Sequence, residues 1–162
     1  MIPKTIQPYF KVTQQTDDGD NNIIKGLLTC CGAYDFEIFT VVKTKHRLFS
    51  KMPLYPEDDK IVFEVRCKKC GKVISVFNSC FDGYEQCGKK QKNICLSTRL
   101  IDCVKCRGES FSVTVKYEYP NTQELQELEI SDIDNAFTWI CITLKCNKCG
   151  AKYRNFVDCE TA

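Results

Sequence analysis

The sequence predicts a small all-β protein with mostly antiparallel strands. Apolar and polar residues alternate with a period of two along residues 35–42, 61–66, 110–117 and 138–144, and these stretches are rich in β-branched and aromatic side chains. Such strands bury one face only, which is typical of antiparallel sheets. Helical periodicity is nearly absent. The one candidate is the acidic stretch 122–128, which reads as a helical turn or a hairpin arm.

Composition and length place the chain among ordinary folded proteins. It has 162 residues, of which 43% are hydrophobic and 27% are charged. Its apolar runs are too short to cross a bilayer, and its N-terminus lacks the pattern of a signal peptide. We therefore expect a cytoplasmic protein. The abundance of Lys, Asn and Ile is compatible with a bacterial or phage origin.

Thirteen cysteines are the most informative part of the composition. In a chain without export signals, paired cysteines indicate metal or redox chemistry rather than disulfides. Three Cys-x-x-Cys knuckles are present, each followed closely by glycine: Cys67/Cys70, Cys103/Cys106 and Cys146/Cys149. Two thiolates at this spacing reach one ion from a tight turn, and glycine tolerates the positive φ that such a turn requires.

A fourth pair, Cys30 and Cys31, is irregular because its members are adjacent. Neighbouring side chains of an extended backbone point in opposite directions, so joint ligation requires a special turn at Gly32. The alternatives are that one of the two binds metal with Cys80, Cys87 or His46 completing the site, or that this half binds no metal.

The knuckles and strands follow the same order twice: knuckle, strand, excursion, strand, knuckle, strand. Cys80 and Cys159 each lie 13 residues after the start of a knuckle, at Cys67 and Cys146. We interpret this as an internal duplication. The expected organisation is a flexible lead-in (1–22), a first unit (23–82), a linker (83–95) and a second unit (96–162).

This order of knuckles and strands resembles the zinc-ribbon family, over roughly residues 23–80 and 96–160. The resemblance implies two tandem ribbon-like units, each stapled by a structural zinc ion on four cysteines. The first site would use Cys30, Cys31, Cys67 and Cys70, and the second Cys103, Cys106, Cys146 and Cys149. A zinc ion with four sulfur ligands has no open position for an activated water, so its expected role is structural.

Catalytic constellations are missing from the sequence. His46 is the only histidine, so no Ser/His/Asp triad is available, and no glycine-rich phosphate loop is present. We expect a protein without enzymatic activity.

Two groups of residues are candidates for partner contact. The first is basic and lies at the knuckles: Lys68, Lys69, Lys72, Lys148, Lys152 and Arg154. These side chains would follow a phosphate backbone or offset the negative charge of zinc–thiolate units. The second is the acidic stretch that carries Leu125, Leu128 and Ile130, which suits a docking arm for another protein.

The favoured function is therefore protein–protein contact, as an adaptor or as an inhibitor or immunity-type partner of another protein. The alternative is a nucleic-acid-binding ribbon that uses the knuckle lysines. The net charge of +2 is too small for a strongly basic face to be the default. A third class is a thiol redox or metal-storage protein.

Overall fold

The computed structural model describes residues 1–17, 19, 21–41, 60–87, 98–121, 125, 130 and 132–162. These form one nine-stranded, mostly antiparallel sheet, which confirms the predicted all-β class. The strands are β1 (Phe10–Asp17), β2 (Asn21–Leu28), β3 (Phe36–Thr40), β4 (Val62–Cys67), β5 (Val73–Asn78), β6 (Arg99–Leu100), β7 (Phe111–Pro120), β8 (Trp139–Cys146) and β9 (Lys152–Glu160). Three short 3-10 helices, η1 (Gln7–Tyr9), η3 (Tyr84–Gln86) and η4 (Ile133–Asn135), flank them.

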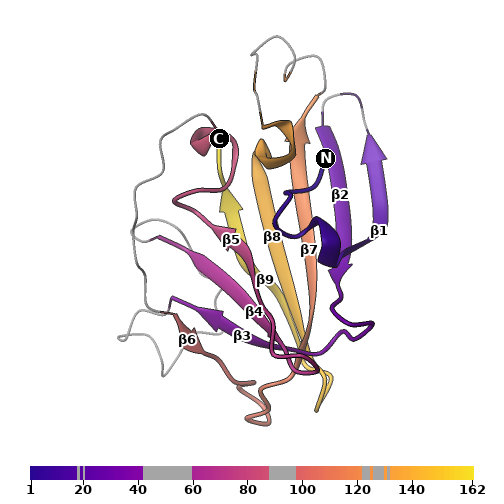
Figure 1. Cartoon of the computed structure of the whole chain (residues 1–162), viewed down its shortest axis with the longest axis vertical. Coiled ribbons are helices and arrows are strands. Elements are labelled where there is room, and N and C mark those ends of the chain that lie inside the picture. Colours follow the sequence, from indigo (N-terminus) through magenta and orange to yellow (C-terminus); the bar gives the residue numbers. More distant parts are fainter. Residues whose placement is uncertain are drawn as a thin grey trace.

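The sheet consists of two arms (Figure 1). The long arm has the strand order β1-β2-β7-β8-β9, and the short arm has the order β6-β3-β4-β5. The arms are joined where Phe36 of β3 pairs with Phe111 of β7. The sheet curls at this junction, so that β4 and β5 cross in front of β9 in Figure 1.

A single hydrophobic core lies between the arms. Every second side chain of β7, from Phe111 to Tyr119, is buried, which is the alternation that the sequence predicted. Ring contacts connect the arms: Phe63 of β4 lies 6.1 Å from Phe156 of β9, and Phe77 of β5 lies 6.1 Å from Phe137. Burial of these apolar faces provides the main driving force for the fold.

The four stretches chosen by alternation correspond to β3, β4, β7 and β8, and β5 and β9 follow the knuckles as expected. Strands β1, β2 and β6 were not predicted. The side chains of β1 are almost all exposed, so this strand lacks the apolar alternation that marks a half-buried strand.

The prediction of a flexible lead-in over 1–22 is wrong. Residues of this range form η1 and β1, and β2 begins at Asn21. Ile6 is fully buried in the core. Gly19, with a φ of 89°, lies between β1 and β2, and its N–H donates to the Asp17 carboxylate at 3.0 Å. The Asp/Asn/Gly-rich stretch is therefore the connection of a hairpin.

The two expected units share one sheet. β2 pairs with β7 from Asn21 opposite Pro120 to Leu27 opposite Thr114, so strands from both units are hydrogen-bonded neighbours. Of the expected linker 83–95, η3 is structured, and residues 88–95 lie outside the described residues.

The two knuckle-bearing segments have matching register. Phe36 of β3 pairs with Cys67 of β4, and Phe111 of β7 pairs with Cys146 of β8. The residue after each of these cysteines donates its N–H to the residue before the phenylalanine: Lys68 to Asp35 at 3.0 Å and Asn147 to Ser110 at 2.9 Å. This agreement is compatible with internal duplication, which stays a prediction.

Candidate metal centres

The second centre is built from one loop and one hairpin. The loop runs from Cys103 to Gly108 and leads into β7, and the hairpin connects β8 to β9 at Cys146–Ala151. The same pair of backbone hydrogen bonds closes each segment. In the loop, Cys103 N–H donates to Gly108 O and Arg107 N–H donates to Cys103 O, both at 2.8 Å. In the hairpin, Cys146 N–H donates to Ala151 O at 2.8 Å and Gly150 N–H donates to Cys146 O at 2.9 Å. The residue after the second cysteine has a positive φ in both, 58° at Arg107 and 73° at Gly150. The knuckle geometry expected from the sequence is therefore present, with arginine in the position of the glycine in one case.

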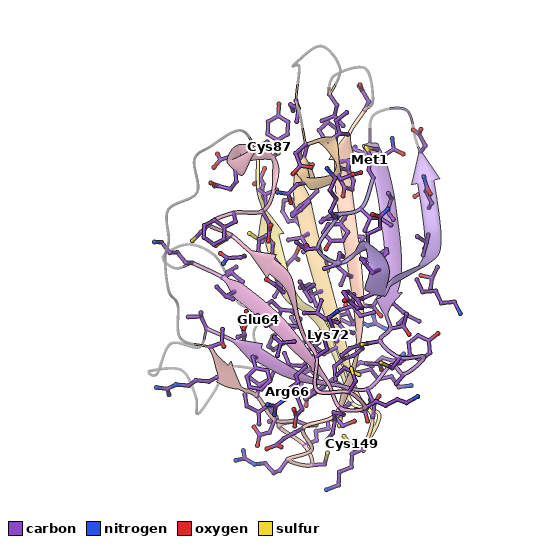
Figure 2. All side chains as sticks on the ribbon, in the orientation of Figure 1. Met1, Glu64, Arg66, Lys72, Cys87 and Cys149 are labelled. Atoms are coloured by element: carbon purple, nitrogen blue, oxygen red, sulfur yellow. The ribbon has the colours of Figure 1, made fainter. Side chains whose placement is uncertain are left out.

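The four sulfur atoms of this centre lie within 4.8 Å of one another. Cys103 Sγ is 3.6 Å from Cys149 Sγ, and Cys106 Sγ is 3.6 Å from Cys146 Sγ. A tetrahedral zinc ion with Zn–S bonds of about 2.3 Å requires sulfur–sulfur separations of about 3.8 Å. The cluster thus has nearly the dimensions of a filled tetrahedral site. It lies at the lower end of the molecule, where Cys149 is labelled in Figure 2.

Tyr153 supports this centre from β9. Its hydroxyl lies 3.0 Å from Cys103 Sγ and accepts a hydrogen bond from the Val104 N–H at 3.1 Å. When Cys103 is a thiolate its sulfur has no proton, so the Tyr153 hydroxyl is the donor of this hydrogen bond. Sequence reasoning did not assign this residue to the metal centre, although its position four residues after Cys149 could have indicated it.

In the first centre, a left-handed turn at Cys31 and Gly32 brings the adjacent cysteines to the same site. Cys31 has a φ of 54° and Gly32 a φ of 71°. Cys30 and Ala33 exchange backbone hydrogen bonds of 3.0 and 2.9 Å across the turn. Positive φ at both central residues defines a type I′ hairpin turn. The two side chains therefore do not point apart as they would in an extended strand.

The sulfur atoms of Cys30, Cys31 and Cys70 lie within 4.8 Å of one another. Cys30 Sγ is 3.6 Å from Cys70 Sγ and 3.8 Å from Cys31 Sγ. Cys67 Sγ adjoins the group and lies 3.8 Å from the Cys30 carbonyl oxygen. The first centre thus gathers the four expected cysteines, less regularly than the second.

The thiols within each cluster differ in their pKa values. Burial raises the pKa of Cys30 to about 12, and its neighbours Cys70 and Cys67 add to the rise. The backbone N–H of Lys72 and the Cys31 thiol lower the pKa of Cys70 to about 7. In the second centre burial raises the pKa of Cys103, but hydrogen bonds from Tyr153 and two backbone N–H groups outweigh it and bring the pKa to about 6. One thiol in each cluster, Cys70 and Cys103, thus has a pKa below its usual value.

The alternative ligands lie elsewhere or outside the described residues. Cys87 lies at the opposite end of the molecule from Cys149 (Figure 2), with its Sγ 3.5 Å from the Gly83 carbonyl oxygen. Cys80 is half-buried and belongs to neither sulfur group. His46 lies outside the described residues. Every described cysteine is a free thiol.

The basic candidates divide between two places. Lys69 Nζ donates to the Cys31 carbonyl oxygen at 3.0 Å, and Lys72 Nζ lies 5.0 Å from the centre of the Tyr9 ring, so both lie beside the first centre. Lys68 and Lys148 are exposed on the two hairpins. Lys152 and Arg154 line a groove on the long arm instead.

The expected docking arm is only partly described. Leu125 is 1% exposed, so its side chain is not available to a partner, and for this residue the prediction is wrong. Its apolar side chain is removed from water by the fold itself. Ile130 is half-buried, and Leu128 lies outside the described residues.

Within the described ranges, no helix is long and apolar enough to cross a membrane. Comparisons of the chain with protein-family models, with curated proteins and with solved structures gave no significant match.

Proposed function

We propose that this chain is a non-enzymatic, zinc-ribbon-like binding protein whose two cysteine clusters each hold one structural zinc ion. The observation that carries this proposal is the second cluster, in which two knuckles bring four sulfurs within 4.8 Å of one another and two of the separations are 3.6 Å. The metal of these clusters is assigned from ligand chemistry: soft thiolates in a tetrahedral set suit zinc. A reducing compartment such as the cytoplasm keeps such thiols available.

Each zinc ion would fasten the two arms of the sheet together. The chain passes between the arms twice, from β2 to β3 and from β6 to β7, and each passage carries cysteines. The first centre fastens the β2–β3 turn to the β4–β5 hairpin, and the second fastens the β6–β7 loop to the β8–β9 hairpin. Structural zinc contributes on the order of 10 kcal/mol to folding. Metal binding and the relative placement of the arms are thus coupled.

With zinc in a structural role, the protein would act by binding a partner. Another protein is the partner that the sequence favoured, with an adaptor or inhibitor role. The burial of Leu125 removes part of the apolar arm that supported this role. The basic groove that contains Lys152 and Arg154 supports the nucleic-acid alternative.

A thiol redox or metal-storage role is the remaining candidate, and the free thiols within 4 Å of one another favour it. The structural and redox roles predict different reactivity of the cysteine thiols toward alkylating reagents. Structural zinc protects its thiolates from alkylation until a chelator is added, whereas redox thiols react at once.

Metal analysis of the protein purified under reducing conditions tests the proposal. Two zinc ions per chain are expected. Cys149→Ala and Cys70→Ala should each reduce the content by about one, whereas the matched control Cys87→Ala should retain both, because Cys87 belongs to neither cluster. Purified protein that is folded without bound metal would refute the proposal.

A further inference from the structure

A basic groove crosses the outer face of the long arm, opposite the buried core. It has a volume of about 780 Å³ and spans β2, β7, β8 and β9. Five of its lining side chains are cationic: Lys25, Lys116, Lys145, Lys152 and Arg154. The floor between them carries the hydroxyls of Ser112, Thr114 and Thr143.

Strand register places the four lysines at the two ends of the groove. Lys25 pairs with Lys116 across β2 and β7, and Lys145 pairs with Lys152 across β8 and β9. Thr114 and Thr143 pair with each other between these two rows. Ser112 pairs with Lys145 and lies four residues from Lys116 along β7, so the two lysine rows are about 14 Å apart.

Both lysine pairs place like charges directly opposite each other, which destabilises a sheet. Lys116 Nζ is 2.6 Å from the Glu118 carboxylate, but within the described residues Lys25, Lys145, Lys152 and Arg154 form no ion pair. Glu118 and Asp158 offset the charge of Lys116, whereas the repulsion between Lys145 and Lys152 is not compensated among the described residues. An anionic ligand that bridges the rows would relieve it.

A β-bulge shapes one wall of the groove. The register between β8 and β9 shifts between Ile142 and Leu144, and Asn155 on β9 has a φ of 51°. The Asn155 side-chain oxygen lies 3.2 Å from Cys141 Sγ, which anchors the bulge to β8. Bulges redirect side chains at binding sites, and this one sets Arg154 and Asn155 in the groove wall.

An aromatic side chain and an acidic row mark the limits of the groove. Tyr34, 39% exposed, contributes to its lining. Beyond Lys116, the next cross-strand row contains Glu118, Trp139 and Glu160. Their carboxylates would repel a phosphate backbone, so the site is short.

We propose that this groove binds a short single-stranded segment of nucleic acid, with phosphates on the lysine rows and Arg154 and with an unstacked base against Tyr34. Hydroxyls and cations suit phosphate oxygens, and an exposed ring suits a base whose face is free, which a duplex does not offer. The site shares Lys152 and Arg154 with the nucleic-acid contacts expected from sequence, but Lys68, Lys69 and Lys72 lie on the short arm and do not belong to it.

Fluorescence anisotropy with labelled 12-nucleotide single-stranded DNA, the same sequence as RNA, and the matching DNA duplex tests the proposal. The single strands are expected to bind more tightly than the duplex, and the DNA and RNA arms identify the sugar that is preferred. Four to five phosphate contacts predict a slope of log K against log salt of about −3. No binding of either single strand at low salt would overturn the proposal.

Variants locate the site. Lys145→Ala/Arg154→Ala should weaken single-strand binding by about tenfold or more and reduce the slope to about −1.5, because two phosphate contacts are lost. The control Lys60→Ala/Arg99→Ala removes one lysine and one arginine from exposed positions outside the groove, and it should leave both the affinity and the salt slope unchanged. Equal weakening by the two double variants would overturn the proposal, since it would indicate a net-charge effect.

Tyr34 provides a second readout. Tyr34→Ala should weaken binding of the oligonucleotide but not of inorganic polyphosphate, whereas Tyr34→Phe keeps the ring and should bind as the wild type does. An acidic peptide of equal charge that binds as tightly as the oligonucleotide would overturn the proposal in favour of an acidic protein partner. The zinc content of each variant separates this test from that of the metal centres: a variant that keeps two zinc ions reports on the groove alone.

Discussion

Replacing Tyr153 with phenylalanine isolates one hydrogen bond at the second metal centre. The change removes the hydroxyl that lies 3.0 Å from Cys103 Sγ and keeps the ring, whose centre is 6.5 Å from that of Phe111. The corresponding residue of the first centre, seven positions after Cys67 as Tyr153 is after Cys146, is Ile74. Ile74 carries no hydroxyl, so the first centre serves as an internal control.

A hydrogen bond to a charged sulfur contributes about 1.5–3 kcal/mol, and its loss also leaves the Val104 N–H without its partner. Since about 1.4 kcal/mol corresponds to a factor of ten, Tyr153→Phe should weaken zinc binding at the second centre by about 10- to 100-fold. Zinc binding at the first centre should not change.

The measurement is a competition titration with a chromogenic chelator at fixed pH, which resolves two zinc ions of different affinity. The Cys149→Ala and Cys70→Ala backgrounds assign the two phases, because each removes a ligand from one centre. An equal shift of both phases, or no shift of either, would refute the role assigned to the Tyr153 hydroxyl.

The remaining predictions concern stability. Burial raises the pKa of Asp82 from 3.8 to about 6, so the folded state binds this proton more tightly than the unfolded state does, and stability falls as pH rises from about 4 to 6. Asp82→Asn should therefore raise the free energy of unfolding at pH 7 by up to about 3 kcal/mol and flatten this pH dependence in urea titrations; a loss of stability at pH 7 would contradict it. Tyr117 and Tyr119 form a matched pair, because the Tyr119 hydroxyl donates to Asp134 O at 2.9 Å and the buried Tyr117 hydroxyl has no partner among the described residues. Tyr119→Phe should cost about 1 kcal/mol in thermal or urea unfolding, whereas Tyr117→Phe should be neutral or stabilising by a similar amount; the reverse order would show that the burial argument fails. Chelator under reducing conditions should abolish the cooperative thermal transition followed by circular dichroism, because about 10 kcal/mol per site is comparable with the whole stability of a domain, and an unchanged transition would argue against structural metal.

Local patterns in the sequence were enough to predict the strands of the core and the sulfur clusters. The alternation in β7 and the knuckle at Cys146/Cys149 are each contained within a few residues. The sequence did not decide whether Cys30 and Cys31 both belong to one sulfur cluster. The answer depends on the left-handed backbone at Cys31, a conformation that non-glycine residues rarely adopt.

Features that depend on distant pairing could not be predicted. Strand β1 is polar, and only its pairing with β2 identifies it. The groove joins Lys25 to Lys116 and Lys145 to Lys152, and the first of these pairs is known only once β2 is placed beside β7. A sequence read for charge runs at the knuckles could find Lys152 and Arg154, but not the lysines that face them.

The position of the first metal centre has a consequence for folding during synthesis. All of its ligands have been made once Cys70 leaves the ribosome, whereas β7, the partner of β2, is complete only at Pro120. At about 5–20 residues per second, roughly 3–10 seconds pass between the synthesis of Cys70 and that of Pro120, and one edge of β2 is unpaired throughout this time. Metal bound at the β2–β3 turn would hold the nascent chain in its native arrangement throughout this interval. The supply of metal would thus affect how much native structure the nascent chain has before β7 reaches β2.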